Sequence, residues 1–145
     1  MIKTTLTLIA IVFISLKSIS QTPDSLTLNG DKIFYKVERE AMFPGGPEGW
    51  RKYLEGNLNA NLARVIKLKR NEKMAQQTAK LQFIVDKQGN ISNVTCVNAN
   101  EIHPKLVKEA IRVIQEGPRW IPAWQNGKDV IYQAIQYITW QNTSE

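Results

Sequence analysis

The stretch TAKLQFIVDKQGNISNV, residues 78–94, carries the clearest structural signal in the chain. Its first half alternates apolar and polar residues, the apolar ones being Ala79, Leu81, Phe83 and Val85. A period of two is typical of a strand with one buried face. The segment DKQGN, residues 86–90, is rich in residues that tolerate the backbone angles of a turn. We therefore predict a hairpin with strands over 78–86 and 91–97.

A helix is predicted on each side of this hairpin. Before it, apolar residues recur at spacings of three and four from Trp50 to Leu62, and this predicts an amphipathic helix that frays near Asn61. After it, His103-Pro104 opens a second amphipathic segment. Gly117-Pro118 is a strong signal for the end of this second helix.

A last strand is predicted over residues 130–140, which are rich in Ile, Tyr and Val. The order of elements is then helix, strand, strand, helix, strand. This order predicts an α+β domain in which the helices pack on one face of a small antiparallel sheet. Alternation at Ile33, Tyr35 and Val37 leaves a further short strand open. The basic stretch 64–77 fits a strand, a helix or a loop.

The first twenty residues differ from the rest. Lys3 precedes an apolar run of about 11 residues, and small residues follow at 18–20, which is the pattern of a signal peptide cut before Gln21. The alternative is an uncleaved anchor, although a spanning helix needs about 20 apolar residues. We expect a signal peptide over 1–20, an N-terminal segment over 21–36, and one domain over 37–142.

The charge and cysteine content exclude several classes of protein. The 145 residues carry 19 basic and 13 acidic side chains, a net charge of +6. Loss of Lys3 and Lys17 with the leader reduces this to +4, which is too weakly basic to indicate nucleic-acid binding. The single cysteine, Cys96, has no partner for an internal disulfide. The domain must therefore fold by burying apolar surface.

No stretch has the pattern of a catalytic or cofactor site. FPGGPEGW, residues 43–50, has no Lys followed by Ser or Thr, so we interpret it as the turn into the first helix and not as a phosphate loop. Cys96 and His103 carry no signature of a nucleophile and base, and we interpret them as a core residue and a helix cap. They also do not complete a metal site. We predict no catalytic residue, metal or cofactor, and an exported enzyme of unknown type is the alternative.

Four blocks of sequence together indicate a family. They are VEREAMFPGG (37–46) with WRKYLEGNL (50–58), LQFIVDKQGNISNV (81–94), HPKLVKEAIRVI (103–114) and RWIPAWQNGKDV (119–130). Their order and spacing over about residues 37–140 resemble the C-terminal domain of TonB, the energy transducer of Gram-negative bacteria, in the form common in Bacteroidetes. The resemblance implies a two-layer α+β fold in which two helices pack on one face of a three-stranded antiparallel sheet.

The resemblance also implies a function. It suggests a periplasmic protein-binding module of TonB-dependent transmembrane transport, without catalysis, small-molecule cofactor or nucleic acid. Its partner would be an outer-membrane receptor, whose TonB-box peptide adds as a strand beside the last strand. A second copy of the chain is another candidate partner for this edge. The implied partner-binding residues are Val130, Ile131, Tyr132, Gln133, Ala134, Ile135, Gln136, Tyr137, Ile138 and Thr139.

Three departures from the family pattern affect these expectations. NLNANLARV, residues 57–65, lacks the Tyr-Pro pair usual after the first helix. Ala134 stands where relatives often have proline, so we expect it to add an N–H group to the binding edge. A cleaved chain has no mechanical link to the inner membrane, whereas a retained leader would make it a short membrane-anchored transducer. The basic residues between 64 and 73 either contact an acidic surface or form a solvated face.

Overall fold

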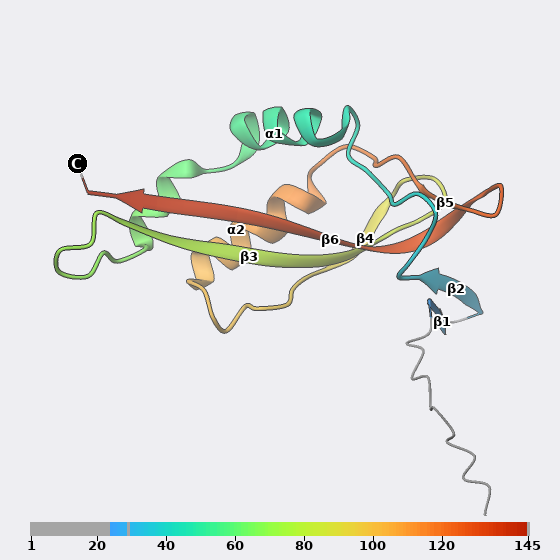
Figure 1. Cartoon of the computed structure of the whole chain (residues 1–145), viewed down its shortest axis with the longest axis horizontal. Coiled ribbons are helices and arrows are strands. Elements are labelled where there is room, and N and C mark those ends of the chain that lie inside the picture. The colour runs from blue at the N-terminus through green and yellow to red at the C-terminus, as the bar shows by residue number, and fades with distance from the viewer. Residues whose placement is uncertain (1–23, 29, 145) are drawn as a thin grey trace, which may run out of the picture.

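The computed structural model describes residues 24–28 and 30–144, and it shows two helices beside a long curled sheet (Figure 1). The elements are β1 (Ser25–Leu28), β2 (Asp31–Phe34), α1 (Gly46–Asn57), the 3-10 helix η1 (Ala60–Val65), β3 (Met74–Val85), β4 (Ile91–Cys96), α2 (Pro104–Gln115), β5 (Ala123–Gln125) and β6 (Lys128–Thr143). The expected signal peptide lies outside the described residues. Within them, no helix has the length and apolar character needed to cross a membrane.

The two longest strands form the centre of the sheet. β3 and β6 pair antiparallel along the whole of β3, from Met74 opposite Thr143 to Val85 opposite Tyr132. β4 pairs antiparallel with the other side of β3, which confirms the predicted hairpin. The strand order is β1-β2-β6-β3-β4, and β5 pairs with the start of β6. The α+β class is therefore confirmed, with a last strand longer than predicted.

The expected three-stranded antiparallel sheet is wrong in strand number and direction. β1 and β2 form a hairpin, and β2 pairs in parallel with β6 through Ile33 opposite Ile131 and Phe34 opposite Tyr132. Sequence periodicity does not reveal a two-residue parallel pairing between segments this far apart, because the pattern is local and the pairing is not. β1 and β2 lie within the expected N-terminal segment 21–36, and this pairing joins them to the sheet.

The core lies on one face of the β3–β6 ladder. From β3 it contains Ala79, Leu81, Phe83 and Val85, each with no exposed surface. From β6 it contains Tyr132, Ala134, Ile138 and Trp140, and from α2 it contains Leu106, Ala110, Val113 and Ile114. Burial of each large apolar side chain contributes about 1.5–3 kcal/mol. The alternating apolar side chains of β3 thus form the buried surface against which α2 packs.

Helix α1 attaches to this core through aromatic rings. None of its residues is fully buried, but Trp50 and Tyr53 lie with ring centroids 5.2 and 5.1 Å from Phe43. Trp120 lies edge-on to Phe43 at 5.8 Å and packs against the ring of Phe83 in β3. The hydroxyl of Tyr53 donates a hydrogen bond of 2.9 Å to the carbonyl of Val113 in α2. The first helix is confirmed, although it ends at Asn57 and η1 follows.

The segment 43–50 forms the turn into α1 and the first turn of the helix, which begins at Gly46. A Cβ atom at Gly49 would lie 2.1 Å from the carbonyl oxygen of Pro44, so only glycine fits there. This close approach holds Phe43 against the first turn of the helix.

Gly89, in the β3–β4 turn, is a second position that requires glycine. Its φ is +81°, and a Cβ atom there would lie 1.9 Å from the carbonyl oxygen of Trp120. We predict that Gly89→Ala lowers the free energy of unfolding by about 3 kcal/mol, because strain and steric overlap add. Gly127→Ala is the matched control, since Gly127 has a φ of +77° but open space around it. Gly127→Ala should lower the free energy of unfolding by only about 1 kcal/mol.

Urea unfolding followed by tryptophan fluorescence measures both variants. Equal losses for Gly89→Ala and Gly127→Ala would show that the contact with Trp120 has no effect on stability.

Candidate functional site at the free edge of the sheet

The two sides of β6 are covered to different extents. β3 covers one side from Tyr132 to Thr143. On the other side, β2 is paired only with Ile131 and Tyr132. Within residues 24–28 and 30–144, no strand follows β2 along this side of β6. The part of β6 beyond β2 is therefore an open sheet edge, which we call the outer edge of β6.

Hydrogen bonds on β3 show which groups of β6 face this outer edge. Lys80 N donates to Asn98 Oδ1 at 2.9 Å and Lys80 O accepts from Val97 N at 2.8 Å, so Lys80 faces β4. Both backbone groups of a strand residue point to one side, and successive residues alternate. The backbone groups of the odd-numbered residues of β3 therefore face β6. In the register of the two strands each of these residues lies opposite an even-numbered residue of β6, so the even-numbered residues of β6 bond to β3. The odd-numbered residues Ile135, Tyr137 and Thr139 face outward.

β5 lies on the same side of β6 as β3. Trp124 exchanges two backbone hydrogen bonds with Arg39, of 3.2 and 2.8 Å, and so faces away from β6. Its neighbours Ala123 and Gln125 must then face β6, where they pair with the even-numbered Val130 and Lys128. β5 and β3 thus pair with the same side of β6 at successive positions, and β2 pairs with the opposite side of β6.

This geometry narrows the predicted binding edge, Val130–Thr139. Val130 is paired with β5, and Ile131 and Tyr132 are paired with β2, so these three residues are not free. The expectation about Ala134 is also wrong, because Ala134 is even-numbered and its N–H points to Phe83 in β3. The N–H group of Ala134 belongs to the hydrogen bonding between β3 and β6, and it adds no donor to the outer edge. The binding role of residues 133–139 stays a prediction.

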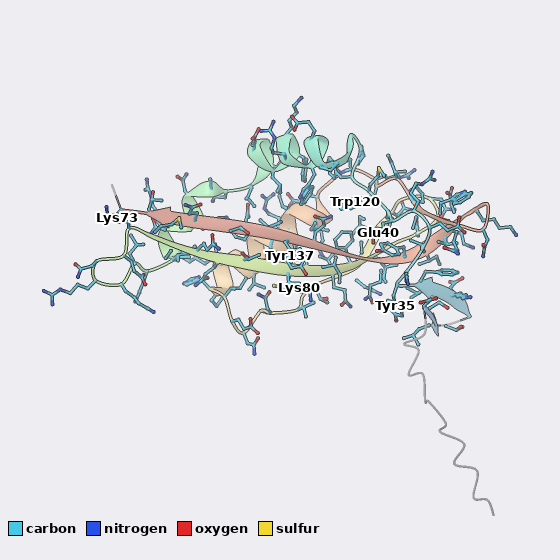
Figure 2. All side chains as sticks on the ribbon, in the orientation of Figure 1. Tyr35, Glu40, Lys73, Lys80, Trp120 and Tyr137 are labelled. Carbon is cyan, nitrogen blue, oxygen red and sulfur yellow. The ribbon has the colours of Figure 1, made fainter. Side chains whose placement is uncertain are left out.

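The side chains along the outer edge divide between the two faces of the sheet. Ile135 and Tyr137 lie on the face away from the helices and are 43% and 58% exposed. Tyr137 pairs with Lys80 of β3, and Figure 2 labels the two near the middle of the ladder. On the helix side, Ala134 and Ile138 are buried, whereas Gln136 between them is half-buried. A strand added at this edge would meet a different environment on each face.

A charged network lies on the helix side of β6, near Trp140. Glu109 of α2 is 8% exposed, and its Oε1 accepts hydrogen bonds from Asn59 N at 2.8 Å and Arg112 Nη2 at 2.7 Å. Arg112 Nη2 also donates to the carbonyl of Asn57 at 2.8 Å. Trp140 of β6 donates through its indole N–H to the carbonyl of Asn59 at 3.4 Å. The connection from α1 to η1 is thus held between α2 and β6.

Cys96 and His103 take part in local structure. The thiol of Cys96 lies 3.4 Å from Asn98 Oδ1, and burial raises its pKa, which disfavours the nucleophilic thiolate. His103 is the N-cap of α2, as predicted, and its Nδ1 accepts from Lys105 N at 3.2 Å. In the part of the chain that the structure describes, no group of three or more His, Cys, Asp or Glu residues could hold a metal ion.

The basic segment 64–73 turns out to be the end of η1 and a loop before β3. Its basic side chains are exposed, and Lys73 lies at the end of the molecule opposite to β1 and β2 (Figure 2). Contact of this segment with an acidic surface stays a prediction.

The geometry described so far is that of an α+β domain in which the residues of β6 beyond β2 form an open edge on the side away from β3. The family described as Gram-negative bacterial TonB protein C-terminal matches residues 70–141, from just before β3 to near the end of β6. The chain thus belongs, over this segment, to the TonB C-terminal domain family, whose members are non-enzymatic, envelope-associated and active in transport. No curated protein and no solved structure matches it. The resemblance over 37–58 lies outside the matched segment and stays a prediction.

Amide hydrogen exchange should reveal the alternation along β6. Ile135, Tyr137 and Thr139 have outward N–H groups, whereas Gln136 and Ile138 bond to β3. We predict that the three outward amides exchange roughly 100-fold faster than their two neighbours, because exchange of the bonded amides requires the ladder to open. Exchange followed by two-dimensional NMR measures each amide separately. Uniform protection along residues 135–139 would contradict the open edge.

The Glu109 network predicts a pH-dependent stability. The hydrogen bond from Arg112 lowers the pKa of Glu109 below its ordinary value of 4.5. A lowered pKa contributes stability that is fully present above pH 4.5 and is lost as the pH falls through the folded value. Glu109→Gln should therefore lower the free energy of unfolding by about 1–2 kcal/mol at pH 7. The difference from the unaltered protein should shrink below pH 4, as measured by urea unfolding at several pH values. If the difference in free energy of unfolding between Glu109→Gln and the unaltered protein does not change with pH, the ionised Glu109 does not stabilise the fold.

Proposed function

We propose that this protein is a periplasmic protein-binding module of TonB-dependent transport, which adds a segment of an outer-membrane receptor as a strand to the outer edge of β6. The observation that carries the proposal is the row of unpaired backbone groups at Ile135, Tyr137 and Thr139. An exposed strand edge is a template for pairing with another chain. Peptide recognition by strand addition uses such an edge.

The length of the outer edge suits a short peptide. It begins where β2 ends opposite Tyr132, and the predicted binding residues run from there to Thr139. A strand rises about 3.3 Å per residue, so a segment of roughly six residues would fill it. Each backbone hydrogen bond adds a net of about 0.5–1.5 kcal/mol to the free energy of binding, and association itself has a cost. We therefore expect modest affinity, which suits a contact that forms and breaks during transport.

The family supports the same reading. TonB C-terminal domains interact with outer-membrane receptors, and they do so without catalysis. The pattern of residues 1–20 supports export, and a start of the mature chain at Gln21 would make the protein a free module. A retained Met1 would support the alternative, a short membrane-anchored transducer. Mass spectrometry of the purified protein distinguishes the two.

Proline at position 135 tests strand addition directly. Ile135→Pro removes an N–H that faces outward, and proline is tolerated on the open side of an edge strand. Ile135→Ala is the matched control, because it shortens the same exposed side chain and keeps the N–H. We predict that Ile135→Pro weakens binding of a synthetic TonB-box peptide at least tenfold and that Ile135→Ala stays within about threefold of the unaltered protein.

Isothermal titration calorimetry measures the affinities, and circular dichroism checks that both variants are folded. Unchanged affinity of a folded Ile135→Pro protein rules out strand addition at this edge. If the unaltered chain self-associates in light scattering and Ile135→Pro does not, a second copy of the chain is the occupant of the edge instead.

A further inference from the structure

A pocket lies on the helix side of β6 beside the outer edge. Its volume is about 210 Å³, and its lining includes Met42, Pro47 and Trp50 together with Gln136 of β6. Met42 belongs to the segment before α1, and Pro47 and Trp50 belong to the first turns of α1. Figure 1 shows α1 running alongside β6, on the side away from β3. Gln136 is the residue of β6 in the lining, and no residue of β3 lines the pocket.

The lining has no charged side chain. Trp50 is half-buried, and Met42 is 39% exposed although it lies beside the aromatic cluster. The polar group in the lining is the amide of Gln136. A charged group placed here would lose its hydration without gaining an ionic partner, which is unfavourable. An apolar side chain would instead release water from the surfaces of a tryptophan, a methionine and a proline.

The register of β6 determines what could enter this pocket. Side chains directly opposite each other on paired strands lie on the same face of the sheet. The residue of an added strand opposite Gln136 would therefore point to the helix side and toward Met42 and Trp50. Its two neighbours would point to the other face, beside Ile135 and Tyr137. One position of the added strand meets the pocket, and the adjacent positions do not.

We propose that this pocket is a specificity site for one large apolar side chain, of the leucine, isoleucine or phenylalanine type, on the peptide that pairs with β6. This inference rests on the proposed function, because the peptide must first add at the outer edge. Backbone pairing then contributes affinity that does not depend on the peptide sequence. The pocket discriminates between peptides through the one residue that lies opposite Gln136. An acidic or basic residue at the same position is rejected.

Symmetric peptides test the preference. The sequence Thr-Gln-Thr-Xaa-Thr-Gln-Thr reads the same in both directions, so the central residue can reach the pocket in a parallel or an antiparallel arrangement. Peptides with Leu, Ala or Asp at the centre are titrated against the protein while the amides of Ile135 and Tyr137 are followed by NMR. We expect the Leu peptide to bind about tenfold more tightly than the Ala peptide, and the Asp peptide more weakly than either.

A matched pair of variants tests the site. Met42 and Ile121 are paired through two backbone hydrogen bonds, of 3.0 and 2.8 Å, and they are 39% and 41% exposed. Only Met42 lines the pocket. Met42→Asp should reduce affinity for the Leu peptide about tenfold and leave affinity for the Ala peptide within about twofold. Ile121→Asp, with the same change at a comparable position, should alter neither.

The outcomes separate the two proposals. If the peptides shift the amides of Ile135 and Tyr137 but bind equally whatever their central residue, the pocket is not a specificity site and strand addition stands. The same conclusion follows if Met42→Asp keeps the preference for Leu. If neither these peptides nor the TonB-box peptide shifts the two amides, strand addition itself fails, and the specificity site fails with it.

Discussion

The register of β6 on β3 is the constraint on which the rest of the structure depends. Along a strand, side chains alternate between faces and backbone groups alternate between edges with the same period. The even-numbered residues of β6 therefore both face the helices and bond to β3, as Ala134 and Ile138 do. The odd-numbered residues Ile135 and Tyr137 expose their side chains and backbone groups together. One register thus determines the core and the outer edge.

The helices cover the inner face of this ladder unequally. α2 fills the space over β3 with a fully buried apolar stripe, whereas α1 contacts the core through the rings of Trp50 and Tyr53. Glu109 and Arg112 tie the end of α1 to α2 through backbone groups at Asn57 and Asn59. The first turns of α1 and Gln136 of β6 line a pocket between them.

The N-terminal hairpin gives the outer edge a defined start. β2 pairs with only two residues of β6, yet it covers the side that an added strand would use. Toward the other end of β6, Trp140 contacts Asn59 in the connection from α1 to η1. A partner peptide therefore meets a short open stretch and not the full sixteen-residue strand. Such a limit reduces the risk of uncontrolled edge-to-edge association.

The sequence by itself determined the hairpin, both helices, the last strand and the family, because each depends on local periodicity or on ordered blocks of residues. The tertiary structure alone decided the parallel pairing of β2, the direction of the Ala134 N–H and the pocket at Met42. Residues 31–34 carry no signal that they pair with residues 131 and 132. Whether a strand N–H faces a neighbour or open space depends on which strand lies on each side. Alternation in a sequence distinguishes the two faces of a strand but not its two edges, so the free edge became visible only in the folded chain.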